Sequence, residues 1–302
     1  MSMAANQPLV SIITINYNNV AVTCDLLLSI ACVNYPNIEV IVVDNASAEN
    51  PTAALVEAYP GIKVIVSEKN LGFAGGNNLG IKAATGDYLF FVNNDTVMTA
   101  GLVDGLLEIF QQYPDAGIVS PKFHYYYAPG VIEFAGYNQV NVFNGRNTMV
   151  GCRKKDYGQY DKVSETHYAH GGGMMVPAKV IAEVGMMPEL YFLYYEEFDW
   201  CEQIKRKGYK VYYQSNALIY HKESMSVGKH STLKTFYLSR NRILFMRRNV
   251  KGVPLVLFTC YFTFITLPKN VATFLVRREM KHLQAFWKGI AWNLSNYNIK
   301  NS

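Results

Sequence analysis

Short apolar runs alternate with longer segments of mixed polarity over the first 120 residues. The runs are rich in Val, Ile and Phe, as are the buried strands of a parallel sheet. The segments between them are long enough for crossover helices and end at Pro or Gly. The pattern therefore predicts an α/β fold with a mostly parallel central sheet and helices on both faces. Strands are predicted at residues 9–17, 38–43, 63–66, 88–92 and 117–120, and helices at 22–32, 51–59, 77–84 and 100–113.

The pattern changes after Pro121. Residues 122–161 are rich in Tyr, Gly and Asn without helical periodicity, so we expect an insertion that contains a hairpin. Residues 169–176 include three consecutive glycines, which predicts either backbone close to a ligand or a bulged strand. Beyond them we expect helices at 178–184, 196–207 and 233–248, and two short strands near residues 211 and 218.

Polar side chains follow four of the predicted strands at the point where each strand ends. Asn and Asp are ordinary turn residues, so one such ending would indicate only a turn. The carboxyl ends of parallel strands meet at one edge of a sheet, however, and four polar endings there predict a binding site. The residues are Asn16, Tyr17, Asp44, Asn45, Asn70, Asn93, Asn94 and Asp95.

The chemistry of these residues fits a nucleotide. Asp44 can accept a hydrogen bond from a base N–H or a ribose hydroxyl, and the glycine-rich turn at 71–76 lets backbone N–H groups approach ribose or phosphate. Asp95 offers an oxygen ligand for a divalent cation on a diphosphate, or alternatively caps the next helix. The glycine spacing is not that of a dinucleotide fingerprint, and no Walker loop is present.

An acidic cluster opens the helix predicted at 196–207. Glu196, Glu197 and Asp199 can raise one another's pKa towards the range of a general base. Alternatively they complement the helix dipole, and we expect Asp199 to be the structural member. His221 ends a short strand; such a histidine is either a structural hydrogen-bonding group or a metal ligand.

Composition excludes a disordered chain, because half of the 302 residues are apolar and 17% are charged. The five cysteines form no C-x-x-C pair, which indicates reduced thiols in a cytosolic protein. The first eight residues lack the basic region and apolar core of a secretory signal.

The positive charge is concentrated at the C-terminal end. Residues 240–302 contain eleven Lys or Arg and one acid, so they carry +10 while the first 239 residues carry −5. Within them, residues 253–276 contain a single charge, Lys269, and are long enough to span a bilayer. Because Pro254, Pro268 and Lys269 interrupt this stretch and basic residues flank both ends, we expect helices that lie in the membrane interface, and no nucleic-acid binding. The alternatives are a true span, an amphipathic packing helix and a homodimer contact.

Together these motifs resemble those of glycosyltransferase family 2, in particular its rhamnosyltransferase-like branch. The resemblance spans about residues 8–250. It implies the GT-A fold with a Rossmann-like sheet, a UDP- or dTDP-sugar donor, a Mg²⁺ or Mn²⁺ ion and inversion at the anomeric carbon. The motifs that carry it are residues 10–18, 42–47, 70–77, 93–95 and 194–199, with Arg240 and Asn241.

The resemblance also implies a domain organisation and roles for individual residues. Residues 1–250 would form the catalytic domain, with a nucleotide-sugar half at 8–121 and an acceptor half at 122–250, and residues 251–302 a basic, apolar tail. The nucleotide-sugar site is expected at Thr14, Asn16, Tyr17, Asp44, Asn45, Asn70, Gly72, Phe73, Gly76, Asn77, Asn93 and Asn94, the metal at Asp95 and His221, the catalytic acids at Glu197, Glu196 and Asp199, and the acceptor near Gly172, Gly173, Met174 and Trp200.

Two positions depart from the family pattern. The D-x-D position reads Asn93-Asn94-Asp95, which leaves one carboxylate and predicts modest metal affinity. Glu196-Glu197 stands where a Glu-Asp pair is usual, which places Glu197 at the general base.

The function implied is transfer of a sugar to a saccharide or lipid-linked saccharide in cell-surface polysaccharide synthesis. The enzyme would work in the cytoplasm, on the inner face of the cell membrane. The rivals are a non-catalytic nucleotide- or sugar-binding protein and a nucleotidyltransferase. The second would normally have a basic glycine-rich loop after the first strand, and residues 16–20 do not form one.

Overall fold

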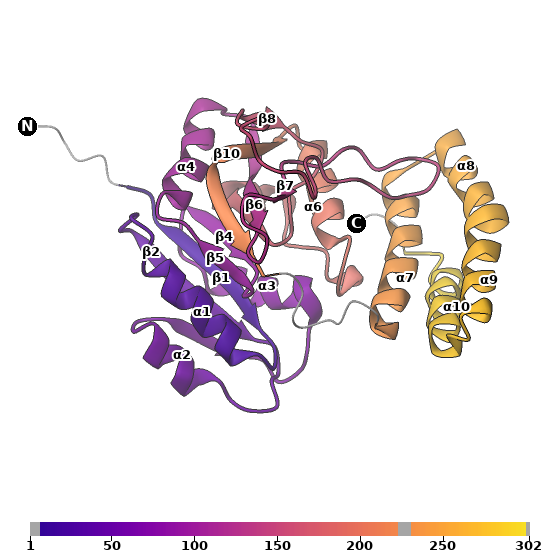
Figure 1. Cartoon of the computed structure of the whole chain (residues 1–302), viewed down its shortest axis with the longest axis horizontal. Coiled ribbons are helices and arrows are strands. Elements are labelled where there is room, and N and C mark those ends of the chain that lie inside the picture. Colours follow the sequence, from indigo (N-terminus) through magenta and orange to yellow (C-terminus); the bar gives the residue numbers. More distant parts are fainter. Residues whose placement is uncertain (1–6, 223–230, 300–302) are drawn as a thin grey trace, which may run out of the picture.

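One ten-stranded sheet forms the centre of the protein (Figure 1). The computed structural model describes residues 7–222 and 231–299, and statements about the structure refer to these residues. The strand order is β3-β2-β1-β4-β9-β6-β10-β5, with β7 beside β6 and β8 beside β10. The first four strands in the chain are parallel wherever they pair with one another. They are β1 (Val10–Asn16), β2 (Ile38–Asp44), β3 (Lys63–Val66) and β4 (Tyr88–Val92).

The second half of the chain completes the sheet with an antiparallel insertion. β9 runs antiparallel between β4 and β6, and this pairs its first residue, Gly173, with Val92 at the end of β4. The glycine run at 171–173 therefore reaches the edge where β4 ends. The predicted mostly parallel sheet is confirmed, with β6 (Ala116–Tyr125), β9 (Gly173–Pro177) and β10 (Lys210–His221) in its path and β5 (Thr96–Met98), β7 (Ile132–Phe134) and β8 (Ser164–Glu165) at its margins.

Alternating strand residues feed two cores, one on each face of the sheet. Ile12 and Val42 pack with the helices of one face, whereas Ile13 and Val43 pack with those of the other. The first face carries α1 (Val20–Ile30), α2 (Thr52–Ala58) and α4 (Leu102–Gln112), and the second α3 (Gly72–Ala83), α5 (Ala178–Val184) and α6 (Glu196–Arg206).

Four local expectations need correction. Asp95 does not cap a helix, because the next three residues form β5 antiparallel to β10. The two short strands expected near residues 211 and 218 are one strand, β10, which contains a register shift. The strand expected at 117–120 is longer, since β6 continues to Tyr125 and pairs with β7 in the expected hairpin. The glycine-rich turn is already helical, because α3 begins at Gly72.

The C-terminal helices lie together at the end of the molecule opposite α1 and α2 (Figure 1). The expected interruption at Pro268 is wrong: a π-helical turn accommodates it, and residues 253–276 form one continuous helical segment. Pro254 and Pro268 both occupy first-turn positions, where proline is tolerated. The elements are α7 (Thr232–Asn249), α8 (Val253–Tyr261), the π turn η2 (Phe262–Thr266), α9 (Leu267–Val276) and α10 (Met280–Ser295), with α10 packed along α7.

The segment Val253–Val276 is long and apolar enough to cross a membrane, with a mean hydropathy of 1.4 and 17% of its most apolar window buried. The basic charge near it is smaller than the sequence suggested. Arg247 donates to carbonyl oxygens of Asn293, Asn296 and Tyr297, and Arg248 pairs with Asp199, so neither is free to meet lipid. The exposed basic residues are Lys251, Lys269, Arg277, Arg278, Lys281 and Lys288.

Candidate active site

Hydrogen bonds tie the ends of β1, β2 and β4 together. Asn16 Nδ2 donates to Asp44 Oδ1 at 2.7 Å, and Asn16 Oδ1 accepts from Thr23 Oγ1 at 2.8 Å. Asn94 Nδ2 donates to the same Thr23 hydroxyl at 2.9 Å. The structure therefore brings together the polar strand ends that the sequence predicted to share one edge.

Asp44 is almost completely enclosed by this network. The residue is 1% exposed; its Oδ1 accepts from Asn16 and from the Ser47 hydroxyl, and its Oδ2 accepts from the Ser47 N–H. A carboxylate oxygen can accept two hydrogen bonds, so Oδ2 keeps the capacity for one more. That capacity suits one contact with a base or ribose.

The glycine-rich segment serves helix packing rather than ligand approach. At Gly72 φ is +72°, and a Cβ would lie 2.2 Å from the Phe192 carbonyl oxygen. A Cβ at Gly76 would lie 2.8 Å from Ile15 Cδ1. Asn45 fixes the approach to α3 by donating to Asn70 Oδ1 and the Gly72 carbonyl. Protein atoms thus fill the space expected for ribose or phosphate.

Several residues expected in the nucleotide-sugar site are consequently structural. Thr14 and Asn16 are 0% exposed, and Asn77 is 2% exposed and donates to the Phe73 carbonyl. Such buried side chains hold the edge of the sheet and, like the 1% exposed Asp44, would touch a ligand only after a rearrangement. The expected residues that keep exposed surface are Tyr17, Asn70, Phe73, Asn93 and Asn94.

Asp95 and His221 meet at the same edge. Their Oδ1 and Nε2 atoms lie 3.1 Å apart, and Glu133 contacts His221 Nδ1 at 2.8 Å from the other side. Burial alone disfavours a charged His221, but the hydrogen bonds and charges of Asp95 and Glu133 outweigh it and raise the pKa of His221 to about 10. Burial lowers the pKa of the neighbouring His170 to about 4, so that ring is neutral.

This pair fits a divalent cation held together with substrate. Asp95 Oδ1 and His221 Nε2, which lie 3.1 Å apart, would hold the ion once Nε2 has lost its proton. A carboxylate on Nδ1 is also the usual partner that presents Nε2 to a metal. Within residues 7–222 and 231–299, no group of three or more His, Cys, Asp or Glu is arranged to hold an ion by itself. Donor phosphates and water would complete the coordination.

The three acids of α6 have different environments. Glu197 is partly buried on a pocket wall, and burial raises its pKa to about 7 although backbone N–H groups stabilise the charged form. Glu196 is 3% exposed, its Oε2 has no partner, and burial together with the Glu197 charge raises its pKa well above normal. Of the three acids, only Glu197 has both a carboxyl group that is accessible from the pocket and a pKa suited to proton transfer near neutral pH.

Asp199, Trp200 and Met174 are fully buried and make structural contacts, as was expected of Asp199 but not of the other two. Asp199 is 0% exposed and accepts from Arg248 and Asn249. Trp200 is also 0% exposed, donates from its ring to the Gly185 carbonyl and packs edge-on against Phe91. Met174 is 0% exposed in the same core. None of the three reaches a sugar.

The expected acceptor glycines form the bridge between Glu197 and the metal end. A Cβ on Gly171 would lie 3.7 Å from the Glu197 carboxyl carbon, so this glycine adjoins the candidate base. The next carbonyl, of Gly172, accepts from the Asn93 N–H at 3.1 Å. Gly173 is buried between Phe123 and Ile219. Two residues of backbone thus separate the candidate base from the strand end that leads to Asp95.

The segment that carries the acids is strained and held from α7. Phe192, Tyr194 and Tyr195 have positive φ values of 64°, 69° and 74°. Such values are unfavourable for residues with a side chain and persist only where surrounding contacts enforce them.

Asn241 and Arg240 supply those contacts. Asn241 Nδ2 reaches the carbonyl oxygens of residues 191, 193 and 194 at 3.0, 2.7 and 2.8 Å. Arg240 donates to the carbonyls of residues 190 and 191. The two residues therefore position the loop that leads into Glu197.

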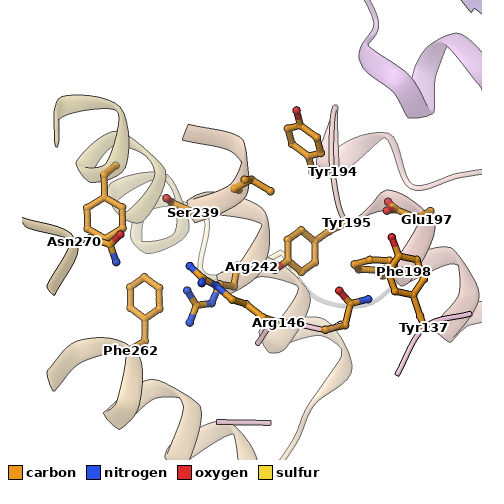
Figure 2. Close-up of a pocket in the computed structure, with 13 residues that line it drawn as sticks. Tyr137, Arg146, Tyr194, Tyr195, Glu197, Phe198, Ser239, Arg242, Phe262 and Asn270 are labelled. Carbon is orange, nitrogen blue, oxygen red and sulfur yellow. The ribbon is translucent and has the colours of Figure 1, made fainter. Parts of the chain in front are cut away.

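A pocket of about 520 Å³ adjoins Glu197 (Figure 2). Tyr137, Tyr194 and Tyr195 lie around the acid, while Phe262 and Asn270 come from the C-terminal helices and form the far wall. This volume lies in the range of small-molecule sites, about 300–1,000 Å³. The pocket thus joins the catalytic acid to the C-terminal helices.

Sequence reasoning missed several residues that the structure brings to the site. Tyr137 and Arg146 lie in the 122–161 insertion, where only richness in Tyr, Gly and Asn was noted. Arg242 was counted with the basic tail. Glu133 could have been suspected only from its place in a hairpin beside β6, because an isolated acid carries no spacing signal.

Comparisons with known proteins agree with the fold. The family model described as glycosyl transferase family 2 matches residues 11–184, more than half of the chain. N-acetylglucosaminyl-diphospho-decaprenol L-rhamnosyltransferase of Mycobacterium tuberculosis is 23% identical over 223 residues, which covers 67% of this chain and 72% of the relative. The amylovoran biosynthesis glycosyltransferase AmsB of Erwinia amylovora is 25% identical and covers 61% of each chain.

Among solved structures, the mannosyltransferase PcManGT of Pyrobaculum calidifontis, in complex with GDP-Man and Mn²⁺, superposes with a TM-score of 0.59 at 15% identity. The match covers 96% of this chain and 88% of the other. The expected GT-A fold and the resemblance to rhamnosyltransferases are therefore confirmed. With its strand-end site, its acid-bearing helix and the family match in agreement, the chain belongs to glycosyl transferase family 2.

Proposed function

We propose that the protein transfers a sugar from a nucleotide-diphosphate donor to a hydroxyl of a lipid-linked saccharide, with inversion at the anomeric carbon. The observation that carries this proposal is the position of Glu197. Its carboxylate has a pKa of about 7, lies on the wall of a 520 Å³ pocket and is two backbone residues from the strand end that leads to Asp95. A general base and a leaving-group site are thus neighbours, as a direct displacement requires.

The donor is assigned to the strand-end edge. Asp44 would contact the base or ribose through Oδ2, and Asn93 and Asn94 present partly exposed amides there. Asp95 and His221 would hold Mg²⁺ or Mn²⁺, which when bound neutralises negative charge that develops on the departing diphosphate. Glu197 accepts the proton of the attacking hydroxyl on the opposite side of the sugar, and Glu196 remains protonated behind it.

The acceptor and the membrane are assigned to the other side of Glu197. The curated rhamnosyltransferase that this chain resembles acts, by its name, on a diphospho-decaprenol saccharide. In the present chain the helical segment Val253–Val276 exposes large apolar side chains, with Phe264 73% and Val256 61% exposed. This surface and the six exposed basic residues around it support attachment to the anionic inner face of the cell membrane.

The catalytic domain is proposed to end near residue 250, with residues 251–302 as the attachment region. Phe262 and Phe286 of that region nevertheless line the pocket beside Glu197, so a truncation at 250 would remove one pocket wall. Membrane attachment is therefore better tested on the full chain. Phe264→Glu combined with Val256→Glu should reduce sedimentation with phosphatidylglycerol vesicles, whereas Val66→Glu, on the exposed edge strand β3, should not. Equal sedimentation of all three proteins would contradict attachment through this helix.

The reaction is tested by screening nucleotide sugars for metal-dependent release of nucleoside diphosphate. Asp95→Ala should abolish the metal dependence, and Glu197→Gln should suppress transfer to an acceptor hydroxyl. Glu57→Gln, an exposed acid on α2, is the matched control. NMR of the product then reports the anomeric configuration, and retention would overturn inversion. Pyrophosphate exchange with a nucleoside triphosphate would indicate a nucleotidyltransferase instead, and full transfer by Glu197→Gln would exclude it as the base.

A further inference from the structure

Two arginines occupy the pocket between Glu197 and the C-terminal helices. Arg242 comes from α7, and Arg146 comes from the 122–161 insertion. Figure 2 shows both guanidinium groups extending into the same part of the pocket, between Tyr195 and Phe262. The proposed function gives neither of them a role.

Arg242 is buried without an acid. It is 6% exposed, its Nε has no hydrogen-bond partner, and its Nη2 makes only a 3.4 Å contact with the Thr266 hydroxyl. Within the described part of the chain, no carboxylate forms an ion pair with it. Its guanidinium also lies over the rings of Phe258 and Phe262, at 5.9 and 5.4 Å.

The other buried arginines of α7 show the contrast. Arg248 pairs with the Asp199 carboxylate, and Arg240 donates to two backbone carbonyls and to Asn241. A buried charge without a partner is strongly unfavourable, and proteins normally compensate it. Arg242 has only the two ring contacts and the Thr266 hydroxyl, and burial and the charge of Arg146 together lower its pKa to about 10.

The surroundings of Arg242 add further donors. Asn147 Nδ2, on the same pocket wall, is a second buried donor without a partner. The Arg146 loop is held in place by a hydrogen bond from its N-terminal residue Asn141 to the Arg146 carbonyl, and by another from the Tyr195 hydroxyl to the Gly145 carbonyl. The pocket is therefore a preformed cluster of cationic and neutral donors.

We propose that Arg146 and Arg242 bind the phosphate or diphosphate group that links the acceptor saccharide to its lipid. This inference rests on the proposed function and specifies its acceptor. Guanidinium groups match phosphate oxygens in charge and geometry. The walls beyond them, from Phe262 and Phe286, are apolar and continue into the helical segment that exposes Phe264.

The position of the site also separates it from the donor diphosphate. The donor is assigned to the edge with Asp95, whereas Arg242 lies in the pocket beside Glu197 and the C-terminal helices, whose lining includes neither Asp95 nor His221. A lipid phosphate bound there would place the first sugar of the acceptor beside Glu197. The arginines would therefore select acceptors by the charged linker and leave the donor untouched.

The test measures binding of farnesyl diphosphate, farnesol and inorganic pyrophosphate to the full chain by calorimetry, without donor and in EDTA. EDTA removes metal-assisted binding of phosphate at Asp95. Wild type should bind farnesyl diphosphate, and Arg242→Gln and Arg146→Gln should each bind it at least about tenfold more weakly, as expected for loss of a charge-assisted hydrogen bond. The control Lys207→Gln, an exposed cation at the end of α6, should bind like wild type.

Arg242→Met separates ligand binding from a structural role. If Arg242 serves a ligand, replacing it by an apolar chain of similar length should leave the melting temperature equal or higher while binding is lost. A clear drop in melting temperature together with unchanged binding would overturn the proposal.

Two further outcomes would also overturn it. Equal affinity for farnesol would show that the pocket recognises the chain and not the phosphate. Equal affinity for pyrophosphate, lost in Arg242→Gln, would assign the site to a free diphosphate. Because binding is measured without donor, the binding result can be interpreted even if the proposed transfer reaction does not occur.

Discussion

The pH dependence of transfer provides the sharpest test of Glu197. With a pKa of about 7, this carboxyl is roughly one-tenth ionised at pH 6 and nine-tenths ionised at pH 8. A base must be ionised to accept a proton, so kcat/KM should rise about tenfold over this interval and then level off. Glu197→Gln should lose about 10²- to 10⁴-fold in transfer and the pH dependence with it.

The assay is steady-state transfer to a soluble acceptor mimic at fixed Mg²⁺, from pH 5.5 to 8.5. Glu57→Gln should keep both the rate and the midpoint near 7. A flat profile in wild type, or an unchanged midpoint in Glu197→Gln, would refute the assignment of the base.

Unfolding provides an independent check on the same carboxyl. Its pKa in the folded protein is above the value of 4.5 in the unfolded chain, so its stabilising contribution is complete below pH 4.5 and is lost as pH rises through 7. Wild type should therefore lose more stability between pH 5 and pH 8 than Glu197→Gln. A larger loss in the variant would contradict a raised pKa.

Three other variants test the supports of the site. Asn241→Ala removes the donor to the carbonyls of residues 193 and 194 and one of the donors to that of residue 191, and should cost about 1–3 kcal/mol in urea unfolding and lower kcat more than KM. An unchanged kcat would show that the loop keeps its conformation without Asn241. Glu133→Gln removes the charge behind His221 and should raise the Mn²⁺ concentration needed for half-maximal donor hydrolysis about 10- to 100-fold, whereas the exposed Glu165→Gln should not. Gly72→Ala places a Cβ 2.2 Å from the Phe192 carbonyl at a φ of +72° and should lower both the melting temperature and the transfer rate. No change in either quantity would mean that the 192–195 loop can move to accommodate the added methyl group.

The parallel half of the sheet was predictable because strands that are buried on both faces appear in the sequence as nearly continuous apolar runs. Val, Ile and Phe fill β1, β2 and β4 almost without interruption, and polar residues end each run. β5 was missed because three residues paired only to β10 are too short for any period to show. The interruption expected at Pro268 does not occur, because a π-helical turn at residues 262–266 precedes the proline. Pro268 then lies in the first turn of α9, where proline is tolerated.

The parts of the candidate site that are formed by residues close together in the sequence could be predicted from it. The parts that are formed by residues distant in the sequence could not. The strand ends and the acidic turn each fall in one short stretch, so composition and spacing identified them. The meaning of the glycines depended on Phe192 and Ile15, which lie against them only in three dimensions. Arg242 looked like part of a membrane-facing charge cluster, because sequence alone does not reveal that its side chain turns inwards.

Three consecutive residues of α7 serve two different tasks. Arg240 and Asn241 fasten the loop before Glu197, and Arg242 points into the acceptor pocket. Since α10 packs along the same helix, any rotation or axial slide of α7 caused at the bilayer would shift the base and the phosphate contact together. Membrane binding would then be coupled to the geometry of the active site, so that the enzyme away from the membrane would have low activity without a separate inhibitor.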